Sequence, residues 1–224
     1  FSWLGLAEKI GKVTFNIWEH GRQKRQDKKH SLEAKKNIQS ITTKNIEIIQ
    51  GDILKLYPKP YTSSSLRPSE PNGLNPYKIV ANIPYYLTSP LIRKFLESEK
   101  PPIEIILMLQ KEVAQRICAK PPNMSILAIS VQFYAIPKVI SIVSKGCFWP
   151  SPKVDSAIIK IEPQNNITKN VDVNTFFKIV KAGFSHPRKQ LANNLSKVLK
   201  LKKEQINSWL LKNNLDPLQR AETL

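Results

Sequence analysis

Short apolar runs alternate with amphipathic segments along the middle of the chain, and this pattern predicts strands and helices in turn. The predicted strands, rich in β-branched residues, are 45–50, 77–81, 103–109, 137–144 and 154–161, with 13–17 as a further candidate. The predicted helices are 89–99, with Ser89 as N-cap and Pro90 at the first helical position, 110–119 and 125–134. Alternation of this kind predicts an α/β sheet that is largely parallel and closes with an antiparallel hairpin.

The pattern changes after residue 162, where apolar residues recur at helical spacing only. They are Phe176, Phe177, Val180 and Phe184, then Leu191, Leu195, Val198 and Leu199, and residues 202–213 form a third candidate helix. We interpret these side chains as packing core, not as a ligand site. The chain therefore divides, as a prediction, into an α/β domain over residues 1–162 and a small all-α domain over 163–224.

Two stretches lack a clear period. Residues 20–36 are basic and polar, which predicts a solvated helix or a disordered loop. Residues 57–76 contain five prolines and three consecutive serines, which predicts a surface loop. Residues 1–45 as a whole fit the α/β pattern poorly.

The distribution of charged residues indicates the kind of partner. The chain has 35 Lys and Arg against 17 Asp and Glu, a net charge of +18, and between Val173 and Lys203 there are eight basic residues and no acid. Clustered positive charge predicts a nucleic-acid partner, bound above all by the domain over 163–224.

Cys118 and Cys147 lack metal or redox spacing and the three histidines form no zinc signature, so we expect reduced thiols, a cytoplasmic location and no metal. No apolar run reaches the roughly 18 residues of a membrane helix.

The stretch Asn82–Ile83–Pro84–Tyr85 directly follows the strand predicted at residues 77–81. Pro84 restricts both its own φ and the conformation of Ile83, so the turn is expected to be rigid. It would present the Asn82 amide, the backbone carbonyls of Ile83 and Pro84, and an aromatic ring at the carboxyl end of a strand, where ligands bind in open α/β sheets.

Such a group of acceptors suits chemistry on the exocyclic amine of a base. The lone pair of adenine N6 is conjugated with the ring, and acceptors on its N–H groups favour a pyramidal nitrogen whose lone pair points at an electrophile. An aromatic side chain holds the extruded base by stacking. The alternative is a proline-containing turn with a surface tyrosine, and from four residues alone that interpretation is favoured.

Four blocks in sequence order resemble the ribosomal RNA adenine N6-dimethyltransferases, which use S-adenosylmethionine. The blocks are residues 51–54 (GDIL), 82–86 (NIPYY), 148–157 (FWPSPKVDSA) and 188–195 (RKQLANNL). Residues 110–116 and 220–224 are similar to the branch of the family that acts on small-subunit rRNA. The resemblance implies a Rossmann-like methyltransferase sheet over 1–162 and a basic helical RNA-binding domain over 163–224. It also implies, as substrate, two adjacent adenines in the 3′-terminal hairpin of that rRNA within an assembling small subunit.

The resemblance also implies roles for particular residues. Asn82 and the Pro84 carbonyl accept hydrogen bonds from the target amine, while Tyr85 and Phe148 stack on the two faces of the flipped adenine. Asp52, with Ile53 and Asn82, contacts the cofactor, and we expect Asp52, Tyr85 and Phe148 to line one cavity. The expected RNA contacts are Lys111, Arg116, Lys153, Arg188 and Lys189. For Phe148, a core position beneath the proline-rich turn is an equal alternative; for Asp52 the alternative is turn capping, and for the basic residues a solvated face.

The sequence departs from the family at its cofactor half. None of its seven glycines forms a GxG, so the glycine-rich loop and the strand before it are expected upstream of Phe1 or lost. Where the family has an acid at the end of its second strand the chain has Ile17, and Glu19 is the candidate substitute. We also expect the family's sequence to continue beyond Leu224, and the protein to be monomeric.

Two other functions remain open at this point. A chain without the glycine loop can be an rRNA-binding assembly factor that methylates nothing, which a measurement of cofactor binding would reveal. A DNA adenine methyltransferase usually has Pro-Pro where this chain has Ile83–Pro84.

Overall fold

The structure is a computed structural model, and it describes residues 13–17, 46–50, 52–55, 77–164 and 171–224. By its internal contacts the chain divides into two compact units, residues 1–75 and 76–224. The segments predicted at 20–36 and 57–76 lie outside the described residues. The helical domain predicted at 163–224 falls within the second unit, and its boundary at residue 162 stays a prediction.

In the first unit, β1 (Val13–Ile17) and β2 (Ile46–Gln50) pair in parallel, with Val13 opposite Ile46 and Ile17 opposite Gln50. The strands predicted at 13–17 and 45–50 are therefore confirmed. Asp52 lies two residues after the end of β2 and begins a turn that extends to Lys55.

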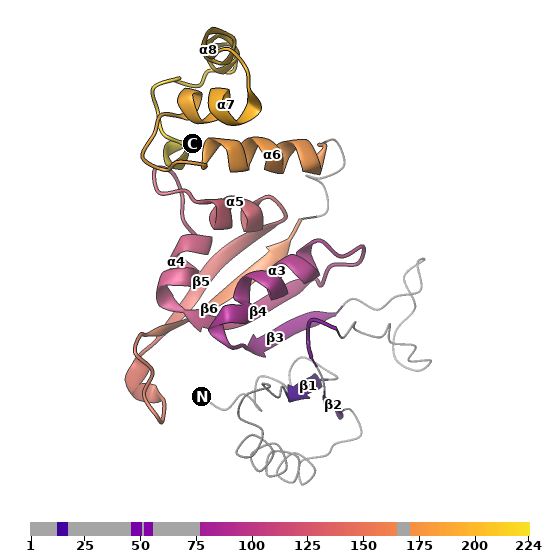
Figure 1. Ribbon diagram of the computed structural model, residues 1–224. Helices are drawn as coiled ribbons and strands as arrows, with labels where there is room; N and C mark the ends of the chain where they lie inside the picture. Colours follow the sequence, from indigo (N-terminus) through magenta and orange to yellow (C-terminus); the bar gives the residue numbers. More distant parts are fainter. Residues whose placement is uncertain (1–12, 18–45, 51, 56–76, 165–170) are drawn as a thin grey trace. The chain divides into compact units, whose positions relative to one another are not determined.

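The second unit contains a four-stranded sheet in the order β3-β4-β6-β5 (Figure 1). Its strands are β3 (Lys78–Asn82), β4 (Glu104–Gln110), β5 (Ala135–Val143) and β6 (Ser156–Pro163). Strand β3 is parallel to β4, whereas β6 is antiparallel to both β4 and β5. This confirms the predicted mixture of parallel strands and a closing antiparallel hairpin.

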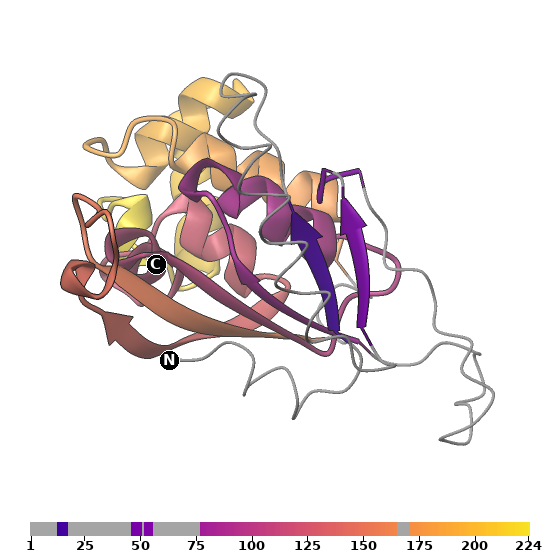
Figure 2. The ribbon, with the colours of Figure 1, turned by 90° about the horizontal axis from the view of Figure 1, so that it is seen from below.

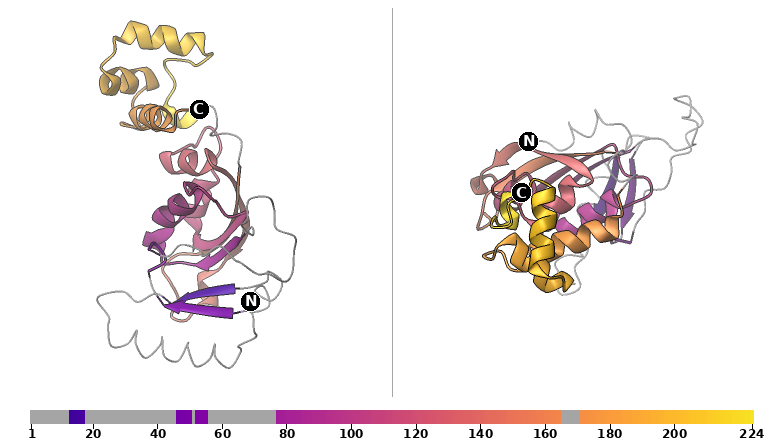
Figure 3. Two further views of the ribbon diagram at one scale, coloured as in Figure 1. Left: turned by 90° about the vertical axis from the view of Figure 1, so that its right-hand side faces the viewer. Right: turned by 90° about the horizontal axis from the view of Figure 1, so that it is seen from above.

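One face of this sheet is covered by α3 (Thr88–Leu96), α4 (Lys111–Ile117) and α5 (Ile126–Gln132), as Figure 3 shows. Alternate residues of the two central strands point to this face and are fully buried: Ile105, Leu107 and Leu109 of β4, and Ala157, Ile159 and Ile161 of β6. Burial of each larger side chain contributes about 1.5–3 kcal/mol, so this layer anchors the strand ends that carry the candidate site.

Three more helices form a cluster of their own: α6 (Val173–Gly183), α7 (Leu191–Leu199) and α8 (Lys203–Lys212). Their shared core is Ala182, Leu191, Ala192, Leu195, Ile206, Leu210 and Ala221. Figures 1 and 2 show these helices, coloured orange to yellow, beside the layer of α3–α5. Phe133, after α5, stacks on Phe176 of α6 with ring centroids 4.3 Å apart, so the aromatics predicted as core do pack.

The start of α3 was predicted wrongly. The helix begins at Thr88, its N-cap is Leu87, and no side chain caps it, whereas the sequence predicted Ser89 as N-cap. A short 3₁₀ helix, η1 (Tyr85–Leu87), leads directly into α3, and Leu87 already has helical angles of φ −88° and ψ −7°. Because the turn merges with the helix, no extended residue precedes it as a capping serine would require.

The helix also ends earlier than predicted, at Leu96, where the Ser98 hydroxyl donates to the Phe95 carbonyl. Among the described residues, no helix has the length and apolar composition to cross a membrane.

Candidate active site at the carboxyl ends of the strands

The Asn82 turn begins where β3 ends. In the parallel register Asn82 lies opposite Met108 of β4, so both strands run toward the same edge of the sheet. Ile83 is 8% exposed and anchors the turn in the core, while Asn82 and Pro84 are exposed. The side chain of Tyr85 lies outside the described residues.

The Pro84 carbonyl already accepts one hydrogen bond, from the Leu87 N–H at 2.9 Å. This bond starts η1 and orients the carbonyl. A carbonyl oxygen has two lone pairs, so Pro84 can still accept from a ligand amine. The geometry is therefore compatible with the acceptor role expected of Pro84.

The loop that carries Phe148 emerges from the same edge of the sheet. We call residues 144–155 the Phe148 loop; it connects β5 to β6, and its two ends meet where Val143 lies opposite Ser156. Ser156 in turn lies opposite Gln110, the last residue of β4. Three strand spacings of about 4.8 Å separate β3 from β5, so about 14 Å lies between Asn82 and Ser141, the β5 residue level with it.

Hydrogen bonds within the Phe148 loop define its shape. It contains a short 3₁₀ helix, η2 (Lys145–Cys147), and Phe148 follows it half-buried, with its N–H donating to the Lys145 carbonyl at 3.3 Å. The Ser151 hydroxyl donates to the same carbonyl at 3.0 Å. The next aromatic, Trp149, is 99% exposed. The loop thus presents one sheltered and one open aromatic side chain.

Asp52 is half-buried and lies in the other unit. Its Oδ1 accepts from the Leu54 N–H at 2.9 Å and its carbonyl accepts from the Lys55 N–H at 2.9 Å. The turn-capping role considered for Asp52 is therefore real. A carboxylate has about four acceptor positions, so Asp52 can cap its turn and also accept from a ligand amine. Ile53 beside it is half-buried.

Two predictions about the site are not tested by the structure. Glu19 lies outside the described residues, and the cavity predicted among Asp52, Tyr85 and Phe148 stays a prediction.

The basic residues expected at the RNA occupy three places. Arg116 is exposed in the last turn of α4, and Lys153 is exposed in the Phe148 loop. Arg188 and Lys189 are exposed in the segment 184–190 between α6 and α7. Lys111 differs from them because its Nζ lies 3.9 Å from Asp155 Oδ2, so part of its charge faces an acid.

The side chain of Asn194, in α7, holds the segment 184–190 in place through hydrogen bonds. Asn194 is 3% exposed, and its Nδ2 donates to the carbonyls of Gly183 at 2.6 Å and His186 at 3.0 Å. These two bonds end α6 and direct the chain that carries Arg188 and Lys189. The sequence contained Asn194 in a block of resemblance, but its spacing alone indicated no role.

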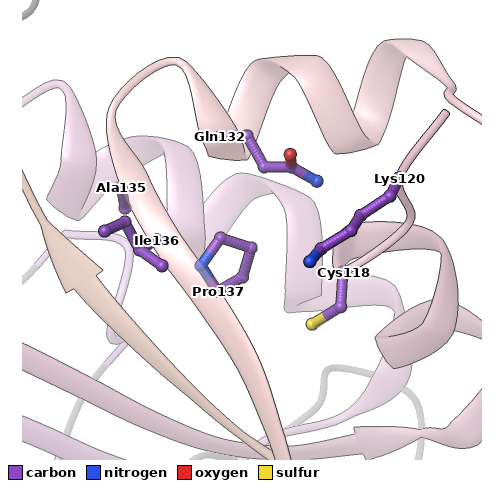
Figure 4. A pocket seen from close by; sticks show the side chains of 6 residues that line it. All are labelled: Cys118, Lys120, Gln132, Ala135, Ile136 and Pro137. Atoms are coloured by element: carbon purple, nitrogen blue, oxygen red, sulfur yellow. The ribbon is translucent and has the colours of Figure 1, made fainter.

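A separate pocket of about 190 Å³ lies near the opposite end of β5 (Figure 4). Cys118, Lys120, Gln132, Ala135, Ile136 and Pro137 line it. The Gln132 amide donates to the carbonyls of Ile117 at 2.9 Å and Ala119 at 2.8 Å, so it is committed to holding the end of α4. Burial raises the pKa of the Cys118 thiol. None of the residues expected at the site lies in this pocket.

Comparison with solved structures identifies the fold. The dimethyladenosine transferase from Plasmodium falciparum superposes with a TM-score of 0.71 at 23% identity, covering 98% of this chain and 88% of that one. The 23S rRNA methyltransferase ErmE gives a TM-score of 0.62 at 18% identity, covering 93% and 75%. The protein therefore has a Rossmann-like methyltransferase fold, as predicted.

Comparison of sequences identifies the family. The model of the family described as ribosomal RNA adenine dimethylase matches residues 25–224. The ribosomal RNA small subunit methyltransferase A of Dehalococcoides mccartyi is 43% identical over 181 residues, which are 80% of this chain and 59% of that protein. The protein of the same name from Alkaliphilus oremlandii is 36% identical over 96% of this chain and 75% of its own length. The chain belongs to the ribosomal RNA adenine dimethylase family, and it spans about three fifths of the first of these relatives.

Proposed function

We propose that this protein is an S-adenosylmethionine-dependent adenine N6-dimethyltransferase of small-subunit rRNA. Its substrate would be two adjacent adenines in the 3′-terminal hairpin, within an assembling small subunit in the cytoplasm. Family membership and the names of the relatives support the reaction and the subunit. The observation that carries the proposal is that the Asn82 turn and the Phe148 loop emerge from one edge of the sheet.

The Asn82 turn would act on the amine itself. The Asn82 side-chain oxygen and the free lone pair of the Pro84 carbonyl accept the two N6 hydrogens, which favours a pyramidal nitrogen with a directed lone pair. Because both groups are attached to a buried anchor, Ile83, they need little reorganisation when the substrate arrives. No general base is required, since the proton can leave the nitrogen after transfer.

The aromatic residues would hold the base. Tyr85 stacks on one face of the flipped adenine and Phe148 covers the other, at a stacking energy of about 1–3 kcal/mol for each. The contribution of these residues to catalysis is then alignment of the nitrogen with the reacting carbon.

The cofactor, when bound, supplies a methyl group on a positively charged sulfur. On this chain Asp52 would accept from the adenine amine of the cofactor, Ile53 would lie against its ring, Asn82 would approach its reactive end and Glu19 would bind its ribose. The free acceptor positions of Asp52 fit that task.

Contacts to the phosphates would position the RNA. We assign them to Lys111, Arg116, Lys153, Arg188 and Lys189 on a protein that acts as a monomer. Phosphate contacts of this kind make affinity fall steeply with salt concentration.

The decisive experiment replaces Asn82 by alanine. We expect methyl transfer to unmethylated small subunits to fall at least about 10²-fold, as for loss of other preorganised hydrogen-bonding groups, while RNA binding is unchanged. Asn123→Ala is the matched control, because Asn123 is an exposed asparagine in the turn between α4 and α5. Full activity of Asn82→Ala would refute the assignment.

The alternative function is an rRNA-binding assembly factor of the same fold without transferase activity. Calorimetry with S-adenosylmethionine distinguishes the two: binding of the cofactor supports the enzyme, and its absence together with rRNA binding supports the assembly factor.

A further inference from the structure

We propose that Asp155 is the positioning residue of the Phe148 loop, holding the loop in the conformation that presents Phe148 to the target base. This inference rests on the proposed function for its catalytic consequence, but the conformational part stands on contacts within the described residues.

Three contacts of Asp155 tie together the start of the loop, its end and the neighbouring helix. Its Oδ1 accepts from the Lys145 N–H at 3.0 Å, across ten residues of chain. Its backbone carbonyl accepts from the Lys111 N–H at 3.0 Å, where β4 passes into α4. Its Oδ2 lies 3.9 Å from Lys111 Nζ. Asp155 therefore joins both ends of the Phe148 loop to the carboxyl end of β4.

The Lys145 contact matters most for Phe148. Lys145 begins η2, and its carbonyl accepts from both the Phe148 N–H and the Ser151 hydroxyl. A residue that fixes Lys145 thus fixes the group on which the backbone of Phe148 depends. Without that clamp the loop must be ordered when the RNA binds, and this entropic cost appears as weaker substrate binding.

The negative charge of Asp155 contributes less to the loop conformation than the hydrogen bond that its Oδ1 accepts from the Lys145 N–H. The side chains of Lys111 and Asp155 are 37% and 36% exposed, and ion pairs with that exposure are weak because water screens them. The hydrogen bond to Lys145 needs only an oxygen, which asparagine also offers. The proposal therefore predicts that Asp155→Asn keeps the function that Asp155→Ala loses.

The test measures kinetics with unmethylated small subunits and hydrogen exchange of the loop. For Asp155→Ala we expect KM for the subunit to rise about tenfold while kcat and cofactor affinity change less than about threefold, as for loss of uniform binding. Amide exchange across residues 144–149 should accelerate about tenfold, because the Lys145 N–H loses its acceptor. Asp155→Asn should stay within about threefold of wild type in both measurements, and the amide exchange of the loop in Lys111→Met should also stay within about threefold.

Asp216→Ala is the matched control. Asp216 is also exposed and accepts a backbone N–H, from Leu218 at 2.9 Å, but it lies after α8. Normal kinetics and exchange for Asp155→Ala would overturn the proposal, as would an Asp155→Asn variant as impaired as Asp155→Ala.

If the wild-type chain transfers no methyl group, the proposed function fails while the exchange measurement still decides the role of Asp155. If Asp155→Ala unfolds, Asp155→Asn and Lys111→Met still test the proposal. Both variants remove the ion pair but keep an oxygen that can accept from the Lys145 N–H, so their exchange rates show whether the hydrogen bond is sufficient to hold the loop. Accelerated exchange in Asp155→Asn would then overturn the proposal, and unchanged exchange would support it.

Discussion

Two segments that carry the expected recognition residues are held by opposite physical means. The Phe148 loop is held by Asp155, a charged side chain 36% exposed, whereas the segment 184–190 is held by Asn194, a neutral side chain 3% exposed. In both cases one polar side chain accepts from or donates to backbone groups about ten residues away in sequence.

The difference between the two segments shows which of the two side chains the stability of the fold depends on. Removal of Asp155 leaves a backbone N–H that water can reach, so the loop loosens without unfolding the protein. Removal of Asn194 leaves the buried Gly183 carbonyl without the donor that Asn194 supplies, whereas the His186 carbonyl still accepts from the Lys189 N–H. A buried unpaired group is costly. The Phe148 loop is therefore adjustable, whereas the exposed segment that carries Arg188 and Lys189 is attached to a folded core through Asn194.

Replacement of Asn194 should have the largest effect on stability. Asn194→Leu retains the volume but removes the donor to the buried Gly183 carbonyl, so we expect a loss of about 1–3 kcal/mol in the free energy of urea unfolding. Asn193→Ala is the control: the Asn193 amide is half-buried and donates to the side-chain Oε1 of Gln190 at 3.1 Å, so its loss should cost about 0.5–1 kcal/mol. If Asn194→Leu and Asn193→Ala destabilise the protein equally, the inference that Asn194 is needed for stability is wrong.

Removal of the basic side chains should divide RNA binding between the two segments. Arg188→Gln combined with Lys189→Gln should lower the slope of log affinity against log salt by about 1.5, and Lys153→Gln by about 0.8, since each phosphate contact contributes about 0.7–0.9. Lys120→Gln, an exposed lysine beside the pocket of Figure 4, should leave the slope unchanged. Filter binding at several salt concentrations provides the slopes, and the same slope for every variant would contradict both assignments.

Acid should weaken the cap of α6 by a smaller amount. Asp172 caps this helix, and its hydrogen bonds from the Thr175 hydroxyl and the Asn174 N–H hold the pKa of its carboxyl below the usual value. A lowered pKa in the folded state stabilises the protein above the ordinary aspartate pKa of about 3.9, and this contribution is lost as the pH falls through the folded pKa.

The measurement compares wild type with Asp172→Asn by thermal unfolding between pH 7 and pH 3. The advantage of wild type at pH 7 should shrink toward pH 3. An advantage that stays constant over this range would show that the charge of Asp172 does not stabilise the helix.

The helices and strands were largely predictable because their patterns are local. Alternating burial along β4 and β6, and helical spacing in α6–α8, follow from apolar residues at fixed intervals. The start of α3 was not predictable by the same means: Ser89 and Pro90 resemble a helix start, but η1 supplies helical backbone before them.

The sequence by itself determined the elements, the basic balance and the blocks of residues that place the chain in its family, because each depends on neighbours along the chain. Only the tertiary structure decided that the Asn82 turn and the Phe148 loop share an edge, because that depends on the strand order β3-β4-β6-β5. It likewise decided the roles of Asp155 and Asn194. A polar side chain acts through whichever backbone group the fold brings within about 3 Å, and no spacing in a sequence encodes that distance.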